Sequence, residues 1–340
     1  MNTHDLQGTA LALVAPGKGV LAADESTPTI TKRFENIELA STEETRRAYR
    51  EMLFTTPALG DFISGVILFD ETIRQHTRDG RPFPEVLGEQ GILPGIKVDK
   101  GTTLLANSPD EKVTEGLDGL RERLAEYFEL GARFSKWRAV IQIGDAMPTR
   151  TCLCSNAHAL ARFAALSQEA GLVPIVEPEV LMEGDHTIQR CERVTEAVLK
   201  TVFQHLSEHR VVLEQMLLKP NMVTAGEDCK QQSSVLEVAE ATLRCLRRAV
   251  PASVPGIVFL SGGQSEVLAT QHLNMMNEIG GAPWQLSFSF GRALQTASLQ
   301  AWGGRNVLSG QQALRHRARC NSAARHGQYS GEMELEAMAA

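Results

Sequence analysis

The amino-acid sequence predicts an α/β protein that folds as one (β/α)₈ TIM barrel. Eight short runs of apolar or β-branched residues alternate with stretches of helical pattern, which is typical of βαβ units around a parallel sheet. The eight units span about 270 residues, as expected of such a barrel. Neither a repeat nor a linker divides the chain. We therefore expect residues 1–325 to form a single barrel domain and residues 326–340, which show no strong pattern, to form a mobile C-terminal tail.

In chain order, the predicted strands are the runs at 19–23, 65–69, 95–98, 137–141, 172–176, 216–219, 256–260 and 285–290. Ser41 and Glu44 form a predicted capping box, which opens a helix that includes Met52. Two further helices are predicted at 157–170, which ends before a glycine, and at 233–250, which ends before a proline. Segments 78–94 and 223–232 lack periodicity and are expected to be loops.

The composition of the chain limits the kinds of protein that it can be. The chain has 340 residues, of which 43% are hydrophobic and 22% charged, enough for a large buried core. Its formal net charge of −7 argues against nucleic acid as a partner, because phosphate backbones are held by clustered Lys and Arg. The densest basic stretch, 315–319, is short and is interpreted as a solvated helix face.

Metal, cofactor and membrane signals are weak. Six scattered cysteines show neither zinc nor disulfide spacing, so we expect reduced thiols in a cytoplasmic protein. His205 and His209 stand in H-L-S-E-H, which is not H-E-x-x-H, and are interpreted as a solvated helix surface. Neither dinucleotide nor P-loop motifs occur. We expect no metal, no cofactor and no membrane partner, since no apolar run approaches 18 residues and the N-terminus lacks a signal-peptide pattern.

Lys219 closes an apolar run that is predicted to be a buried strand. An ammonium in such a place must find an anionic partner or lose its proton, since an isolated buried charge costs several kcal/mol, roughly. A neutral amine is a nucleophile toward carbonyl groups. The alternative is a lysine at a strand end whose head group simply reaches solvent.

Ionisable residues gather at the ends of the predicted strands, often as pairs two residues apart. Two residues on a strand separated by one other lie on the same face, and a barrel strand must keep its helix-facing side apolar. We therefore expect these groups to point into the mouth of the barrel, where active sites of this architecture lie. Four are cations and four are anions: Lys97, Lys136, Arg138, Lys219, Asp24, Asp99, Glu177 and Glu179. Cationic neighbours would favour a neutral Lys219, and the two glutamates could move protons during imine formation.

Phosphate-binding residues are predicted after the last two strands. Ser261, Gly262 and Gly263 follow the seventh strand, and Gly291 and Arg292 follow the eighth. Barrel phosphate sites are commonly built by these loops, where glycine lets backbone N–H groups approach the anion and arginine adds a charged fork. The alternative is that both are simple turns.

Three polar residues after the first strand give a weaker signal. Ser26, Thr29 and Arg33 are candidates to hold a second phosphate.

These segments together resemble the class I, metal-independent fructose-bisphosphate aldolases. The resemblance covers about 15–330 and includes APGKGVLAADES, GVILFDET, GIKVDKG, SKWRAV, VPIVEPE, LLKPNMV, FLSGGQS and SFGRAL, in the same order. It implies reversible cleavage of fructose 1,6-bisphosphate to dihydroxyacetone phosphate and glyceraldehyde 3-phosphate. A phosphorylated sugar is the implied partner, and a homotetramer is the implied assembly.

The resemblance also implies roles. Lys219 matches the Schiff-base lysine, Glu177 the general acid/base and Glu179 its neighbouring carboxylate. Asp24 matches the residue that takes the proton of the C4 hydroxyl. The remaining matches are to the cationic frame (Lys136, Arg138 and Lys97), the phosphate site on the dihydroxyacetone side (Ser261, Gly262, Gly291 and Arg292) and the other end of the sugar (Ser26, Thr29 and Arg33).

Two departures from the family pattern stand out. Vertebrate members end in a tyrosine that helps protonate the enamine, whereas the last tyrosine here is Tyr329. Phe290 replaces a tyrosine common before the Gly-Arg of the eighth strand. A lyase for another phosphorylated ketose, such as fructose 1-phosphate, and a binding or scaffold homologue with reduced catalysis stay open as alternatives.

Overall fold

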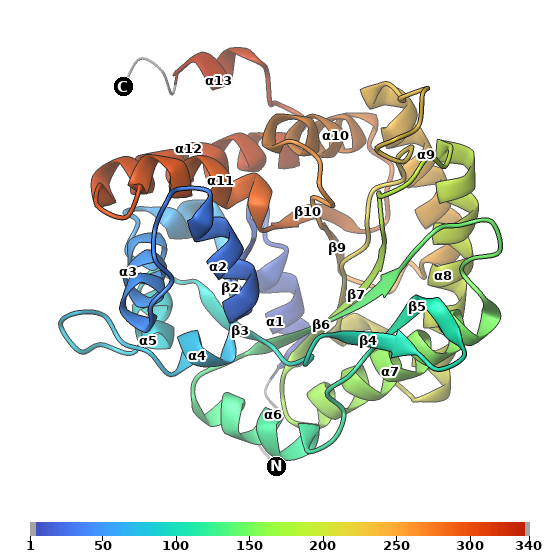
Figure 1. The fold of residues 1–340 in the computed structure, drawn as a ribbon, viewed down its shortest axis with the longest axis horizontal. Coiled ribbons are helices and arrows are strands. Elements are labelled where there is room, and N and C mark those ends of the chain that lie inside the picture. Colours follow the sequence, from blue (N-terminus) through green and yellow to red (C-terminus); the bar gives the residue numbers. More distant parts are fainter. Residues whose placement is uncertain (1–4, 337–340) are drawn as a thin grey trace.

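The computed structural model describes residues 5–336, and its main sheet is a closed barrel of parallel strands (Figure 1). Around the ring the order is β1, β10, β9, β8, β7, β6, β3 and β2. The predicted (β/α)₈ barrel is therefore confirmed. The strands are β1 (Gly19–Ala22), β2 (Ile63–Leu68), β3 (Leu93–Lys97), β6 (Phe134–Ile141), β7 (Val173–Val180), β8 (Leu217–Leu218), β9 (Gly256–Phe259) and β10 (Gln285–Phe290).

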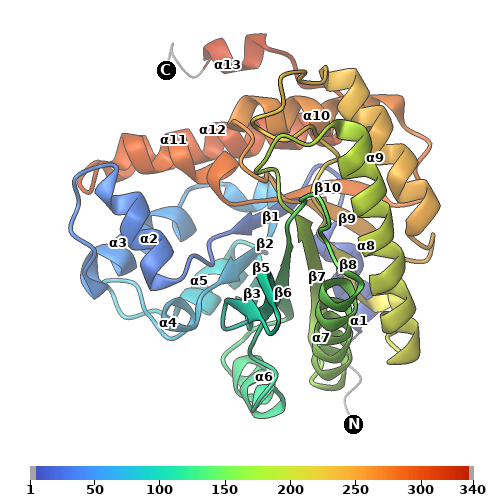
Figure 2. The same ribbon diagram turned by 45° about the vertical axis from the view of Figure 1, so that its right-hand side comes forward.

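Helices surround this ring, and Figure 2 shows several of them standing along its outer face. They alternate with the strands, so that each parallel step is made by a crossover through a helical segment. The helices are α1 (Leu6–Leu13), α2 (Thr27–Glu35), α3 (Glu43–Phe54), α4 (Asp70–Ile73), α5 (Phe83–Glu89), α6 (Leu120–Glu129), α7 (Arg150–Glu169), α8 (Ile188–Glu208), α9 (Val235–Ala249), α10 (Glu266–Ile279), α11 (Arg292–Trp302), α12 (Val307–Arg325) and α13 (Glu332–Glu336).

Three local expectations are wrong. The segment expected to be a loop at 78–94 contains α5 and the start of β3, because prolines fit the first turn of a helix and Phe83, Val86 and Leu87 bury one face. The capping box of α3 is formed by Thr42 and Thr45, each one residue later than the predicted pair, Ser41 and Glu44. A small antiparallel hairpin, β4 (Thr102–Leu105) and β5 (Ser108–Thr114), also occurs where no strand was expected. The loop expected at 223–232 is confirmed.

The barrel has two apolar cores. The larger one lies between the strands and the outer helices. The smaller one fills the interior near the strand starts and includes Leu13 and Val14 at the end of α1. Glycines make room for this filling: a Cβ at Gly95 would lie 2.2 Å from the ring of Phe134, and one at Gly65 would lie 2.6 Å from Leu13. Helix α1 therefore closes the end of the barrel opposite the strand ends.

Helix α12 ends at Arg325, and the chain beyond it packs on α10 and α12. The backbone N–H of Tyr329 donates to Asn274 Oδ1 at 2.9 Å, and its hydroxyl donates to Glu334 Oε1 at 2.7 Å. Glu334 in turn pairs with Arg317. The division at residue 325 and the mobility expected of 326–340 stay predictions, and residues 337–340 lie outside the described part. Within that part, no helix is long and apolar enough to cross a membrane.

Candidate active site

The charged residues predicted at the strand ends meet in one cavity of about 500 Å³ at the C-terminal mouth of the barrel. Strand β6 supplies Lys136 and Arg138, and β7 supplies Glu177 and Glu179. The spacing of two residues places both members of each pair toward the cavity, as predicted. The register of the two strands sets Arg138 beside Glu177.

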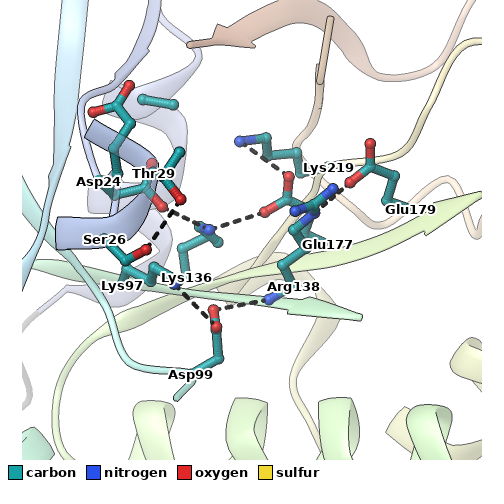
Figure 3. A network of polar contacts seen from close by, with 12 residues as sticks. Asp24, Ser26, Thr29, Lys97, Asp99, Lys136, Arg138, Glu177, Glu179 and Lys219 are labelled. Atoms are coloured by element: carbon teal, nitrogen blue, oxygen red, sulfur yellow. Dashed lines mark hydrogen bonds and ion pairs between the residues drawn. The ribbon is translucent and has the colours of Figure 1, made fainter. Parts of the chain in front are cut away.

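Lys219 follows directly after β8, where its backbone N–H donates to the carbonyl oxygen of Val176 at 2.8 Å. Its side chain is buried and has an anionic partner, because Nζ lies 3.2 Å from Glu177 Oε1. The other oxygen of Glu177 lies 3.2 Å from Lys136 Nζ, which itself lies 2.7 Å from Asp24 Oδ2 (Figure 3). Four buried or nearly buried groups of alternating charge thus form one chain across the mouth.

The network fixes the charge of its members. Burial alone would raise the pKa of Asp24, but the charges of Lys136, Lys219 and Lys97 outweigh it and hold that pKa well below its usual value. The pKa of Glu177 is likewise lowered, since Lys136 and Lys219 outweigh the effect of its burial. Burial opposes the charge of Lys136, yet the neighbouring carboxylates raise its pKa. These three groups are therefore ionised at neutral pH.

The pKa of Glu179 is shifted in the opposite direction from that of Glu177, although only one residue separates the two. Burial raises the pKa of Glu179, and Arg138, with which it pairs, lowers it only in part. Two carboxyl groups with pKa values moved in opposite directions are suited to different proton-transfer roles. At the edge of the network, Lys97 Nζ lies 3.3 Å from Asp99 Oδ1, and Asp99 also accepts a hydrogen bond from the backbone N–H of Arg138 at 3.3 Å.

The loops after β9 and β10 form one end of the cavity. Ser261, Gly262, Gly291 and Arg292 line it, and Arg292 opens helix α11, whose first turn presents backbone N–H groups. Arg292 is exposed and forms no ion pair within residues 5–336. A cationic fork at a helix N-terminus suits a phosphate group.

Gly263 is the one predicted residue that does not line the cavity. A Cβ at this position would come 3.7 Å from a guanidinium nitrogen of Arg292, which does line the cavity. Gly263 instead forms part of a turn: its φ of +89° is a backbone conformation that glycine adopts without strain.

Helix α2 supplies the opposite wall. Ser26, its N-cap residue, lies with its Oγ 3.0 Å from Thr29 Oγ1, and both line the cavity with Arg33. Arg33 is held by a buried carboxylate, Glu25, which also binds Arg50 of α3 at 2.5 Å. The three predicted residues are therefore brought together at one place.

Several residues that line or support the cavity were not predicted from the sequence. Glu25 adjoins Asp24 in the sequence, which is a signal that could have found it, but its role depends on Arg50 from another helix. Lys112 reaches the cavity from β5 of the unexpected hairpin. Ser289 on β10 lines the cavity with a buried hydroxyl that has no hydrogen-bond partner among residues 5–336. Its position one residue before Phe290 carries no signal in the sequence.

Phe290 itself is fully buried and packs against Phe288, with 5.6 Å between ring centroids. Tyr329 does not line the cavity. Among residues 5–336, no group of three His, Cys, Asp or Glu side chains with metal-ligand spacing lies in it either.

The chain matches known proteins over nearly its whole length. A family model described as "Fructose-bisphosphate aldolase class-I" covers residues 5–340. A probable fructose-bisphosphate aldolase class 1 of Xanthomonas campestris is 58% identical over 97% of this chain and 100% of its own. A fructose-bisphosphate aldolase of Echinococcus multilocularis is 54% identical, over 98% of this chain and 93% of its own.

The fold agrees with these sequence matches. A solved structure of fructose-bisphosphate aldolase from Plasmodium falciparum, in complex with TRAP and a small-molecule inhibitor, superposes with a TM-score of 0.95 at 51% identity, covering 96% of this chain and 95% of that one. The chain belongs to the class I fructose-bisphosphate aldolase family.

Proposed function

We propose that this protein reversibly cleaves fructose 1,6-bisphosphate to dihydroxyacetone phosphate and glyceraldehyde 3-phosphate through a Schiff base at Lys219. Its family supports the reaction. The observation that carries the mechanism is the buried chain of charges in which Lys219 touches Glu177 and Glu177 touches Lys136.

The first step forms the imine. Glu177 is ionised and lies beside the ammonium of Lys219, so it accepts the proton that the amine must lose before attack. The amine then adds to the C2 carbonyl of the sugar. Glu177 returns the proton to the resulting hydroxyl, which leaves as water, and the C=N bond forms in its protonated state. A carboxylate that both accepts and returns one proton is consistent with the general acid/base role that the family resemblance gives Glu177.

The second step breaks the carbon–carbon bond. Asp24 is ionised and is held by Lys136, so it can take the proton of the C4 hydroxyl. The C3–C4 bond electrons move into the protonated imine, which becomes an enamine, and glyceraldehyde 3-phosphate is released. Protonation of C3 and hydrolysis of the imine then free dihydroxyacetone phosphate and restore Lys219.

The two ends of the cavity suit the two phosphates of the substrate. Arg292, with the Ser261–Gly262 loop, would hold the phosphate on the dihydroxyacetone side. Arg33, with Ser26 and Thr29, would hold the other phosphate, and Lys97 and Arg138 complete the cationic frame. Comparing kcat/KM for fructose 1,6-bisphosphate and fructose 1-phosphate in the wild type and in Arg33→Ala tests this assignment. The variant should lose activity toward the bisphosphate selectively.

Assembly and location are part of the proposal. We propose a homotetramer, as the family resemblance implies, in the cytoplasm. Relatives from Arabidopsis thaliana and Cicer arietinum are named cytosolic and cytoplasmic. Light scattering after size exclusion measures the mass of the assembly, and cell fractionation measures its location.

Trapping the imine tests the reaction and the residue together. The protein is incubated with dihydroxyacetone phosphate and borohydride, digested, and mapped by mass spectrometry. The proposal expects one reduced adduct per chain, on Lys219, and cleavage activity lost in proportion to labelling. An adduct on Lys136, or no adduct in an active protein, would contradict it.

A further inference from the structure

Three histidines meet on the outer surface of the barrel, away from the cavity. His158 lies on α7, His205 lies on the last turn of α8, and His209 is the residue that caps the C-terminus of α8. The two helices are neighbours that pack against each other (Figure 2). From the sequence, His205 and His209 were interpreted as a solvated helix surface. The structure adds a third imidazole, that of His158 on the preceding helix α7.

The ring positions suit a common ligand. The ring centroid of His158 lies 5.0 Å from that of His209 and 6.1 Å from that of His205. Each of the three residues has a ligand nitrogen within 4.8 Å of those of the other two. Three nitrogens around one tetrahedral zinc ion lie about 3.4 Å apart, since each Zn–N bond is about 2.0–2.1 Å long. The nitrogens must therefore come closer together to share one ion, and His158, whose side chain is exposed, has the most freedom to move.

The second nitrogens of two of the rings already have suitable neighbours. His209 Nδ1 lies 3.0 Å from the carbonyl oxygen of His205, an arrangement that leaves Nε2 as the free ligand atom when Nδ1 carries the proton. His205 Nδ1 is buried and makes no hydrogen bond within residues 5–336, but Glu208 Oε2 lies 3.4 Å from it. Such carbonyl and carboxylate partners orient metal-ligating imidazoles.

The electrostatic setting of the cluster is mixed. The carbonyl end of α8 carries the negative pole of the helix dipole, and Glu208 adds a carboxylate. Arg162, one turn beyond His158 on α7, opposes a cation.

We propose that His158, His205 and His209 bind a divalent first-row transition-metal ion, with water completing a tetrahedral site. Imidazole is a preferred ligand of Zn²⁺, Ni²⁺ and Cu²⁺. The site is separate from catalysis. Helix α8 leads into β8, so its C-terminus lies beside the starts of the strands, whereas the catalytic cavity opens at their ends. The ion would join α7 to the end of α8, and its effect is expected on thermal stability.

Zinc titration of the full-length protein tests the proposal. Protein stripped with EDTA and dialysed is titrated with Zn²⁺ against a chromophoric chelator, and its thermal midpoint is recorded with and without the ion. We expect one tight site per chain and a higher midpoint with zinc. His158→Gln and His209→Gln should each weaken affinity at least tenfold and abolish the increase in midpoint, while cleavage activity is unchanged. Glu208→Gln should weaken affinity less.

His76→Gln is the matched control, because this histidine is exposed and lies apart from the cluster. It should leave zinc affinity within twofold. A second group of possible ligands, His316, Cys320 and Glu334, offers a competing site. Undiminished zinc binding in the His158→Gln, His209→Gln double variant would overturn the proposal. If zinc binding were then lost in His316→Gln, the ion would be assigned to the second group. The proposal would also be overturned if the wild-type protein bound no zinc stoichiometrically. Circular dichroism confirms that each variant is folded.

Discussion

Glu177 lies between two buried ammonium groups and contacts Lys219 with one carboxylate oxygen, at 3.2 Å. The contact resolves the choice that the sequence leaves open for Lys219, because the buried lysine has an anionic partner. In the proposed mechanism Glu177 has two roles: its carboxylate stabilises the ammonium of Lys219 and accepts the proton that must leave before the amine can attack.

Lys219→Ala should abolish imine formation. We expect kcat to fall at least about a thousandfold, or about 4 kcal/mol of barrier, because no other group replaces the covalent step. Borohydride trapping with dihydroxyacetone phosphate measures the imine, and a coupled assay measures cleavage. Persistent labelling of the variant would place the nucleophile elsewhere.

Glu177→Gln should lower kcat by about a hundredfold or more, because proton transfer to and from the carbinolamine is lost while the shape of the site is kept. Glu179→Gln is the matched comparison, since Glu179 pairs with Arg138 and its pKa is raised. Glu179→Gln should lower kcat less than Glu177→Gln does. Single-turnover rates of imine formation separate the two variants, and equal losses would argue against a distinct role for Glu177.

Lys136→Met should change how stability depends on pH. The pKa values of Asp24 and Glu177 lie below their ordinary values of 3.8 and 4.5, so their ionisation stabilises the fold above that range and this contribution is lost as the pH falls through the lowered values. Without Lys136 the two buried carboxylates repel each other at neutral pH. The deficit in the free energy of unfolding should be about 3 kcal/mol at pH 7. It should shrink toward pH 4, because in the variant burial and mutual repulsion favour the protonated carboxyl groups, and protonation removes the repulsion.

Urea denaturation at both pH values measures this deficit. Lys200→Met is the control, because Lys200 forms an exposed pair with Glu196 on the surface of α8 and its loss should cost at most about 0.5 kcal/mol. A deficit for Lys136→Met that does not vary with pH would contradict the buried network.

Arg292→Ala should raise KM more than it lowers kcat. The phosphate that it would bind changes little during the reaction, so its contribution is mostly uniform binding, although some loss of kcat follows from misplacement of the reacting carbon. Steady-state kinetics measure both constants. Arg305→Ala, which removes an exposed arginine a short way beyond α11, should change neither. An unaltered KM in Arg292→Ala would remove this residue from the phosphate site.

Tyr329→Phe should leave kcat within about twofold, since the hydroxyl binds Glu334 and lies outside the cavity. It should lower the thermal midpoint slightly, because a hydrogen bond to a carboxylate is removed. A tenfold loss of kcat would show that Tyr329 leaves its place on α10 and α12 and reaches the mouth of the barrel during turnover.

Most of the barrel could be predicted because each strand is a short apolar run between helical segments. The β4–β5 hairpin could not, since its residues are largely exposed and carry no apolar alternation. The catalytic pairs could be predicted because a spacing of two fixes a shared face on any strand. The pairing of Glu25 with Arg50 and the histidine cluster could not, because each depends on how two helical segments are rotated against each other. Spacing along one segment carries no information on that rotation.

The closure of the barrel by α1 has a kinetic consequence. Leu13, Val14 and the ring of Phe134 fill the end opposite the strand ends, so within residues 5–336 the cavity is reached from the C-terminal mouth of the barrel. In the proposed mechanism the dihydroxyacetone fragment is held covalently by Lys219, whereas the aldehyde is free to leave once the carbon–carbon bond is broken. Release should therefore be ordered, with glyceraldehyde 3-phosphate departing first. In the reverse direction dihydroxyacetone phosphate must arrive before its partner, and an excess of the aldehyde should inhibit condensation by occupying the passage ahead of it.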